Sequence, residues 1–163
     1  MEFKKLGGEN IDSYIAYLER AMEEEPDMMT AESVEEEGIR GRIKDPFYQN
    51  SVSLLAMEDG QVLGRIEYHF YGCLQDGYRM AYVDWVYVLK AHRHRGIAGA
   101  LFRAFEEECR ANRIDQYFLI RSEEENANRF YRKFQNAELS SVPVLRKELG
   151  ESCGKKNGIR GGV

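Results

Sequence analysis

Residues 86–102 read VYVLKAHRHRGIAGALF, and this stretch decides the fold. An apolar run typical of a buried strand leads into a loop of basic and histidine side chains, and the loop continues through Gly96 into an apolar helix. The first turn of a helix has unpaired N–H groups and the positive end of the helix dipole, which favours an anion such as a pyrophosphate. Glycine lets the backbone approach such a ligand closely. The stretch therefore predicts a phosphate-binding strand, loop and helix.

Periodic patterns place further elements on both sides of this stretch. Upstream they predict a short strand at 2–6, a helix from Ile11 to Met22 ended by Pro26, and a weaker helix from about Ser33. Alternating strands at 51–57 and 62–71 form a hairpin around 58–61, and 81–89 is a central strand. Downstream follow a strand at 116–120, a helix opened by a capping-box pair, and terminal strand material: Ser122 with Glu125, then Leu139 to Leu149.

The strand at 62–71 has two unlike faces. The side chains expected on one face are apolar: Val62, Ile66, Tyr68 and Phe70. Those expected on the other face are polar: Arg65, Glu67 and His69. This pattern predicts a sheet with one wetter face.

Length and composition indicate one globular domain over residues 1–149, followed by a Gly-rich, basic, flexible tail at 150–163. The chain has 163 residues, 43% hydrophobic and 31% charged, and a net charge of −5, which argues against a surface built for nucleic acid. It contains no apolar run long enough to cross a membrane and no hydrophobic leader at its start. We therefore expect a cytoplasmic protein without nucleic-acid or membrane partners.

Charge is divided unevenly along the chain. Residues 1–60 have 15 acids and 6 bases (−9), and the remainder has 13 acids and 17 bases (+4). These acids are either solvated helix faces or groups that attract a cationic ligand. The acidic residues concerned are Glu23, Glu24, Glu25, Asp27 and Glu35–Glu37, with nearby aromatics Tyr14, Tyr17, Phe47, Tyr48, Tyr68 and Tyr82.

The phosphate turn resembles the acetyl-CoA motif of the GNAT N-acetyltransferase superfamily, Gln/Arg-x-x-Gly-x-Gly/Ala, here Arg93 to Ala98. The order of elements over residues 2–149 is similar to that family, and ENANRFYRKF and VLRKEL resemble its last helix and closing strand. The resemblance implies an α/β (α+β) GNAT fold, a mixed sheet of six to seven strands with a splayed fourth strand and about four helices.

The resemblance also implies direct transfer of an acetyl group from acetyl-CoA to an amine of a small molecule or peptide. Backbone N–H groups of the turn would hold the pyrophosphate, and the edge of the central strand would pair with the pantetheine amides. The cofactor-binding residues expected on this basis are Val86, Tyr87, Val88, Arg93, His94, Arg95, Gly96, Ile97, Ala98 and Gly99. The acceptor would bind on the acidic half, which favours a cation such as a polyamine, an aminoglycoside or a protein amine, and homodimers are frequent in the family.

Two residues are candidates for the proton transfers. Asp84 is the one ionisable residue of an apolar strand, and we expect it to be buried on the same face as Val86, where it is either the base for the amine or a structural carboxylate. Tyr131 matches the last-helix tyrosine that protonates the CoA thiolate in the family, and core packing is its alternative role. Retaining both residues favours an enzyme over a silent acyl-CoA sensor or an acidic partner-binding module.

No metal or cysteine chemistry is expected from the sequence. His92 and His94 are flanked by basic residues without nearby carboxylates, which disfavours a metal site. Cys73, Cys109 and Cys153 are scattered and have no ligand or nucleophile spacing.

Overall fold

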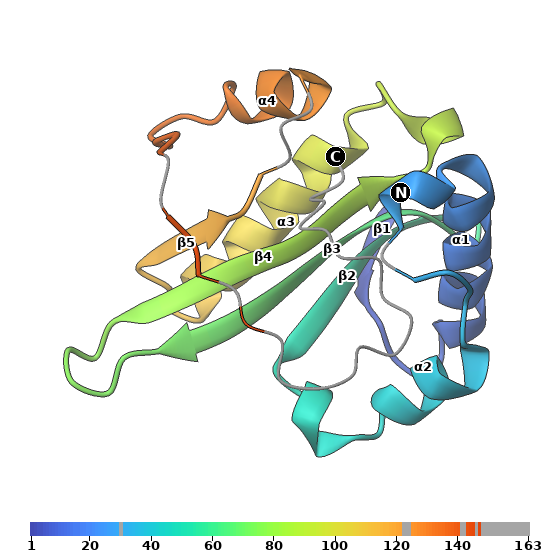
Figure 1. The fold of residues 1–163 in the computed structure, drawn as a ribbon, viewed down its shortest axis with the longest axis horizontal. Coiled ribbons are helices and arrows are strands. Elements are labelled where there is room, and N and C mark those ends of the chain that lie inside the picture. The colour runs from blue at the N-terminus through green and yellow to red at the C-terminus, as the bar shows by residue number, and fades with distance from the viewer. Residues whose placement is uncertain (30, 122–124, 141–142, 146, 148–163) are drawn as a thin grey trace.

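Five strands form a single mixed sheet in the order β1-β2-β3-β4-β5 (Figure 1). The computed structural model describes residues 1–29, 31–121, 125–140, 143–145 and 147. The strands from β1 to β4 pair antiparallel, and β5 joins β4 in parallel because a helix intervenes between them in the chain. The strand bounds are β1 Glu2–Lys5, β2 Ser51–Glu58, β3 Gln61–Gly72, β4 Arg79–Val88 and β5 Gln116–Leu119.

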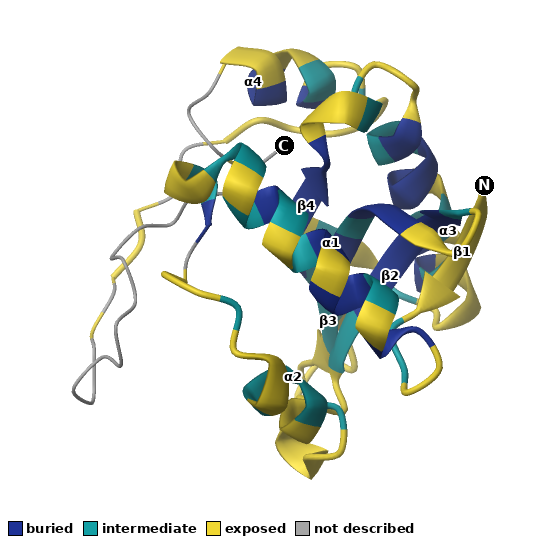
Figure 2. Ribbon diagram, turned by 90° about the vertical axis from the view of Figure 1, so that its right-hand side faces the viewer, coloured by how far each residue is buried: buried dark blue, intermediate teal, exposed yellow. Residues whose placement is uncertain are grey.

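Helices cover both faces of this sheet (Figures 1 and 2). Helix α1 (Ile11–Glu24) packs on one face, and α3 (Ile97–Ala111) packs on the other, where α4 (Glu125–Tyr131) joins it. Alternate residues of the strands supply a core to each helix, as the two-residue period of a strand requires. The α3-side core includes Ile66, Tyr68, Val83, Val86 and Phe105; the α1-side core includes Tyr14, Tyr17, Leu55, Tyr87 and Leu89.

The predicted helices and hairpin are confirmed, with shifted ends. Helix α1 ends immediately before the turn at Pro26, whose ring cannot continue a helix. Helix α2 (Glu36–Arg42) begins later than Ser33 and buries none of its residues, in line with its thin apolar pattern. Ser122, the expected cap of α4, lies outside the described residues.

The sheet has fewer strands than the six to seven expected. Within the described part of 139–149, no residue belongs to a strand, and the tail at 150–163 lies outside the described residues. Pro143 has no N–H to donate to a neighbouring strand, and Val144 and Leu145 are 62% and 96% exposed. The sequence pattern there was therefore a poor guide to strand pairing.

A bulge in β3 corrects the expected face of Val62. Ala56 pairs with Gly64 and Met57 pairs with Val62, so Leu63 is an extra residue that reverses the alternation. Val62 consequently packs in the α1-side core, whereas Ile66 and Tyr68 pack toward α3 as predicted. Among the helices described, none is both long enough and apolar enough to cross a bilayer.

Candidate active site

The loop between β4 and α3 presents backbone groups suited to an anion. Gly96 is left-handed (φ 76°) and precedes α3, whose first backbone hydrogen bond runs from Ala100 N–H to Gly96 O at 3.0 Å. The N–H groups of Ile97, Ala98 and Gly99 come before that bond and have no acceptor within the helix. The turn thus offers the amides and the positive helix end that a pyrophosphate requires, so the chain fits acetyl-CoA at this point.

The arginine side chains of the motif bind the protein itself. Arg93 Nε donates to Val88 O at 3.1 Å, and its guanidinium forms an ion pair with Glu25. Tyr87 Oη also donates to Glu25, at 2.9 Å, and the Arg93 guanidinium lies 5.3 Å from the Tyr87 ring centroid. Arg93 therefore links the end of α1 to β4, and its guanidinium is engaged by Glu25 rather than open to a phosphate.

Other side chains of the loop also contact the protein. Arg95 Nη2 donates to Glu58 at 2.8 Å, and the Ile97 side chain is buried in the core beneath the turn. His94, like Gly96, has a positive φ (62°) and is exposed, so the loop backbone faces solvent. At the loop's start, Lys90 N–H donates to Glu24 at 2.6 Å.

Strand β4 leaves its partner β5 at Val83. The parallel pairing runs from Met80 with Gln116 to Val83 with Leu119 and ends there, while β4 continues to Val88. Beyond Val83, no described strand pairs with β4 on the β5 side. The side chains of Val86, Tyr87 and Val88 are buried, so this free edge offers backbone groups to a ligand, as expected of a splayed fourth strand.

A bulge at Asp84 accompanies this divergence. Glu67 pairs with Trp85 and Tyr68 pairs with Val83, which leaves Asp84 opposite no residue of β3. Val83 and Val86 consequently share the α3-side core although they are three positions apart. The expectation that Asp84 is buried on the face of Val86 is wrong: Asp84 is exposed and points to the opposite face.

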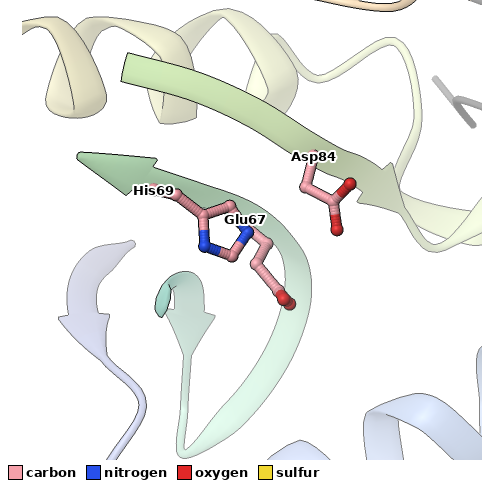
Figure 3. A group of neighbouring side chains, drawn as sticks. All are labelled: Glu67, His69 and Asp84. Atoms are coloured by element: carbon pink, nitrogen blue, oxygen red, sulfur yellow. The ribbon is translucent and has the colours of Figure 1, made fainter. Parts of the chain in front are cut away.

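Three side chains that can take or share a proton meet on that opposite face (Figure 3). Glu67 and His69 project from β3 and Asp84 projects from the bulge of β4, and one ligand atom from each lies within 4.8 Å of the others. The wetter face predicted for Arg65, Glu67 and His69 is therefore confirmed. Asp84 joins them because the bulge turns it there.

Arg65 fixes the charge of Glu67. The two side chains form an ion pair, in which Arg65 is 13% exposed, and Ser53 Oγ donates to Glu67 Oε2 at 3.0 Å. Burial raises the pKa of Glu67, but the Arg65 charge and the Ser53 hydrogen bond outweigh it and lower that pKa below its usual range. Glu67 is thus ionised and neutralised by Arg65, which leaves Asp84 as the unbalanced charge of the group.

An aromatic row lies beside this group. His69 is opposite Tyr82 and Tyr82 is opposite Phe118 in the sheet register, with ring centroids 6.3 and 5.1 Å apart. Tyr82 therefore lies on the wetter face, as expected for an acceptor site. Tyr68 lies on the other face of the sheet, because successive side chains of a strand point to opposite faces. Its ring centroid is 4.7 Å from that of Phe105 on the α3 side.

Tyr131 lies in an aromatic cluster rather than at the sheet edge. Tyr131 is 7% exposed, and its ring centroid lies 6.1 Å from that of Phe102 and 5.7 Å from that of Phe134. Burial raises the pKa of Tyr131 above its usual range, so its hydroxyl remains protonated at neutral pH. These contacts satisfy the packing role, and its catalytic role stays a prediction.

The acidic residues of the first 60 positions are used in part by the protein's own cations. Glu24 and Glu25 bind the loop after β4, and Glu36 shares Arg40 with Asp12 at 2.6 and 2.5 Å. Of these acids, Glu25 is balanced by Arg93, whereas Glu36 and Asp12 share one cation and Glu24 accepts from a backbone N–H.

Residues 15–136 match the acetyltransferase (GNAT) family, which is more than half of the chain. The chain belongs to the GNAT acetyltransferase family. GNAT enzymes use acetyl-CoA, and the turn at Gly96 lies within the matched region.

Solved GNAT structures share this fold at low sequence identity. A ribosomal-protein-alanine N-acetyltransferase from Brucella melitensis biovar Abortus 2308 is 19% identical, covers 90% of this chain and 99% of its own, and has a TM-score of 0.70. The aminoglycoside acetyltransferase meta-AAC0020 from an uncultured soil metagenomic sample, in complex with sisomicin, is 13% identical, with 91% and 96% covered and a TM-score of 0.75. Aminoglycoside N-acetyltransferase AAC(6')-Iy in complex with CoA is 14% identical, with 91% and 100% covered and a TM-score of 0.65. No curated protein sequence matches the chain significantly.

Sequence reasoning did not find the contacts of Glu67, His69 and Glu25. Glu67 and His69 were placed on the correct face, but only the bulge brings Asp84 beside them. Glu25 was expected only among the acids that attract an acceptor, and its pairing with Arg93, 68 positions away, gave no local signal. A pairing between a carboxylate at a helix end and a basic loop is visible only in the folded structure.

Proposed function

We propose that this GNAT acetyltransferase acetylates a primary amine that binds on the sheet face carrying Asp84, Glu67 and His69. One observation carries the proposal: the bulge that frees the edge of β4 also turns Asp84 toward that face. The proposed cofactor edge and an accessible carboxylate thus lie two to four positions apart on one strand. An amine and a thioester held there would be neighbours.

The backbone supplies the acetyl-CoA contacts in this proposal. The amides of Ile97, Ala98 and Gly99 bind the pyrophosphate, and the edge of Val86–Val88 binds the pantetheine chain. Acetyl-CoA supplies the activated acetyl group. Because Val88 O already accepts from Arg93, the strand is held in place before the ligand arrives.

Asp84 is the proposed proton acceptor. An amine must lose a proton to attack a carbonyl, and an exposed carboxylate reaches it directly or through one water. Asp84 also favours the ammonium form of the incoming acceptor, since the charge of Glu67 is balanced by Arg65. Tyr131 is proposed to return a proton to the departing thiolate.

The acceptor class follows from charge and from the aromatic row. An unbalanced carboxylate beside Tyr82 and Phe118 suits a cationic amine attached to a ring or to an apolar chain. Two of the similar structures are named as an aminoglycoside acetyltransferase and a ribosomal-protein-alanine N-acetyltransferase, and an aminoglycoside or a protein amine fits this description. The comparisons favour neither.

A screen for acetyl transfer tests the proposal. Purified protein, acetyl-CoA and a panel of aminoglycosides, polyamines and peptides are analysed by mass spectrometry for an added acetyl group, at two ionic strengths. We expect transfer to at least one cationic amine, weakened by salt. Asp84→Asn should lower kcat/KM by about 100-fold, as removal of a general base does.

Asp59→Asn provides the matched control. Asp59 lies in the hairpin turn between β2 and β3, and the substitution makes the same change of charge away from the site. Equal activity of Asp84→Asn and wild type would overturn the role of Asp84. Tight acetyl-CoA binding without transfer to any amine would favour a sensor instead.

A further inference from the structure

The group formed by Glu67, His69 and Asp84 has the arrangement of a metal site. Glu67 and His69 are two positions apart on β3, so their side chains leave the same face of the strand. Asp84 approaches from the neighbouring antiparallel strand, and one ligand atom from each residue lies within 4.8 Å of the other two (Figure 3). Three ligands from two rigid strands leave one side open, as in zinc sites that keep a position for water.

The hydrogen bonds of Glu67 leave one carboxylate oxygen available. Oε2 accepts from both Arg65 and Ser53, whereas Oε1 has only Ser51 Oγ at 3.4 Å, a weak contact. Arg65 and Ser53 therefore orient the carboxylate in the way that outer partners orient a metal ligand.

The other two ligands are equally unoccupied within the described part of the chain. His69 makes no hydrogen bond there, and its ring lies nearly parallel to Tyr82, at 18°. Asp84 makes no hydrogen bond or ion pair there, and its place in the bulge leaves it opposite no residue of β3. Zinc bonds of about 2.0 Å require roughly 3.3 Å between ligand atoms, so binding would draw the group closer together, with the exposed Asp84 side chain as the ligand that moves.

We propose that Glu67, His69 and Asp84 bind one divalent transition-metal ion, with Zn²⁺ as the best match to one imidazole and two carboxylates. The two carboxylates balance the ion, and the nearby Arg65 guanidinium opposes it, so we expect affinity in the micromolar range. This revises the expectation of no metal, which considered His92, His94 and the scattered cysteines but not this group.

The proposed ion and the proposed amine would use the same carboxylates. Zn²⁺ therefore inhibits acetyl transfer by competing with the amine and leaves the turn at Gly96 free to bind CoA. This consequence rests on the proposed function, but the binding of the ion does not. Metal binding is measurable even if no amine is ever acetylated.

Metal titration of the whole chain tests the site directly. Untagged, EDTA-treated protein carries Cys73→Ser, which removes an exposed thiol, and is titrated with Zn²⁺ by calorimetry and with Co²⁺ by absorption. We expect one ion per chain and a higher Tm with Zn²⁺, because the ion binds only the folded protein. His69→Gln and Asp84→Asn should each weaken binding at least tenfold.

His92→Gln is the matched control. His92 lies in the turn before Arg93 and contacts Arg95, outside the proposed group, so its variant should bind Zn²⁺ as the parent does. Circular dichroism melting of each variant without metal separates loss of the site from loss of the fold. No saturable binding by the parent, binding unchanged in folded His69→Gln, or binding lost in His92→Gln overturns the proposal.

Discussion

Replacing Glu25 by glutamine should weaken the binding of acetyl-CoA, although Glu25 lies at the end of α1 and outside the phosphate turn. Its carboxylate holds Arg93 and Tyr87, and Arg93 in turn holds Val88 O at the free edge of β4. The substitution keeps the shape of the side chain and removes its charge. The loop and the strand edge then lose their common anchor.

The magnitude follows from the burial of the pair. The Arg93 and Glu25 side chains are 28% and 22% exposed, so solvent screens part of their attraction. Hydrogen bonds to charged groups contribute about 1.5–3 kcal/mol, and with this discount we expect a loss of about 1–2 kcal/mol. If the whole loss comes from a less ordered turn, the Kd for acetyl-CoA rises up to roughly 30-fold, since about 1.4 kcal/mol corresponds to a factor of ten. Any part that falls on the whole fold lowers Tm by about 2–4 °C per kcal/mol.

Calorimetric titration with acetyl-CoA and thermal melting measure the two parts separately. Glu23→Gln is the matched control, because Glu23 is exposed on the same helix and the change of charge is identical. That variant should keep both Kd and Tm. Glu25→Asp, which retains the charge on a shorter side chain, should recover part of the affinity.

The sign of the effect separates two roles for Arg93. If the Arg93 side chain instead bound the pyrophosphate, removing its competitor Glu25 would free its charge and tighten acetyl-CoA binding. A lower or unchanged Kd in Glu25→Gln would therefore refute the anchoring role. A lower Tm with unchanged Kd would assign the pair to the stability of the fold alone.

Three further outcomes are expected. Tyr131→Phe should lower kcat tenfold or more with little change in acetyl-CoA affinity, and steady-state kinetics with an unchanged rate would exclude it as the proton donor. Gly96→Ala should lower stability by about 1 kcal/mol because its φ of 76° strains any side chain, whereas Gly41→Ala in a helix should raise Tm; equal melting curves would contradict this. Arg65 lowers the pKa of Glu67 in the folded protein, so ionised Glu67 stabilises the fold at pH values above the usual glutamate pKa. This contribution should be lost as the pH falls through the lowered pKa. Thermal melting at successively lower pH should show the loss, and Glu67→Gln should show less of it.

The sequence sufficed wherever the signal was local. Helical spacing from Ile11, the hairpin turn at Asp59-Gly60 and the turn at Gly96 each depend on neighbours in the chain, and the structure places all three as predicted. The closing strands failed because a strand needs a partner, and exposed Leu145 shows that apolar residues alone do not provide one.

The site was predicted less completely than the fold because its side chains are paired over long distances. An alternating pattern gives the face of Glu67, but a bulge opposite it changes the face of Asp84, and no local pattern marks that extra residue. The motif predicted the backbone of the turn and not the destination of Arg93. A guanidinium finds its partner only once α1 and β4 are packed together.

The bulge in β4 has a consequence for substitutions at Asp84. Asp84 pairs with no residue of β3 and lies beyond the last pair with β5, so replacing its side chain affects no paired position of the sheet. Residues only two to four positions further along form the edge proposed for acetyl-CoA. One strand thus joins a position whose side chain the sheet does not constrain to an edge that Arg93 holds in place, so substitutions at Asp84 should alter the proposed handling of the amine without altering the edge proposed for acetyl-CoA.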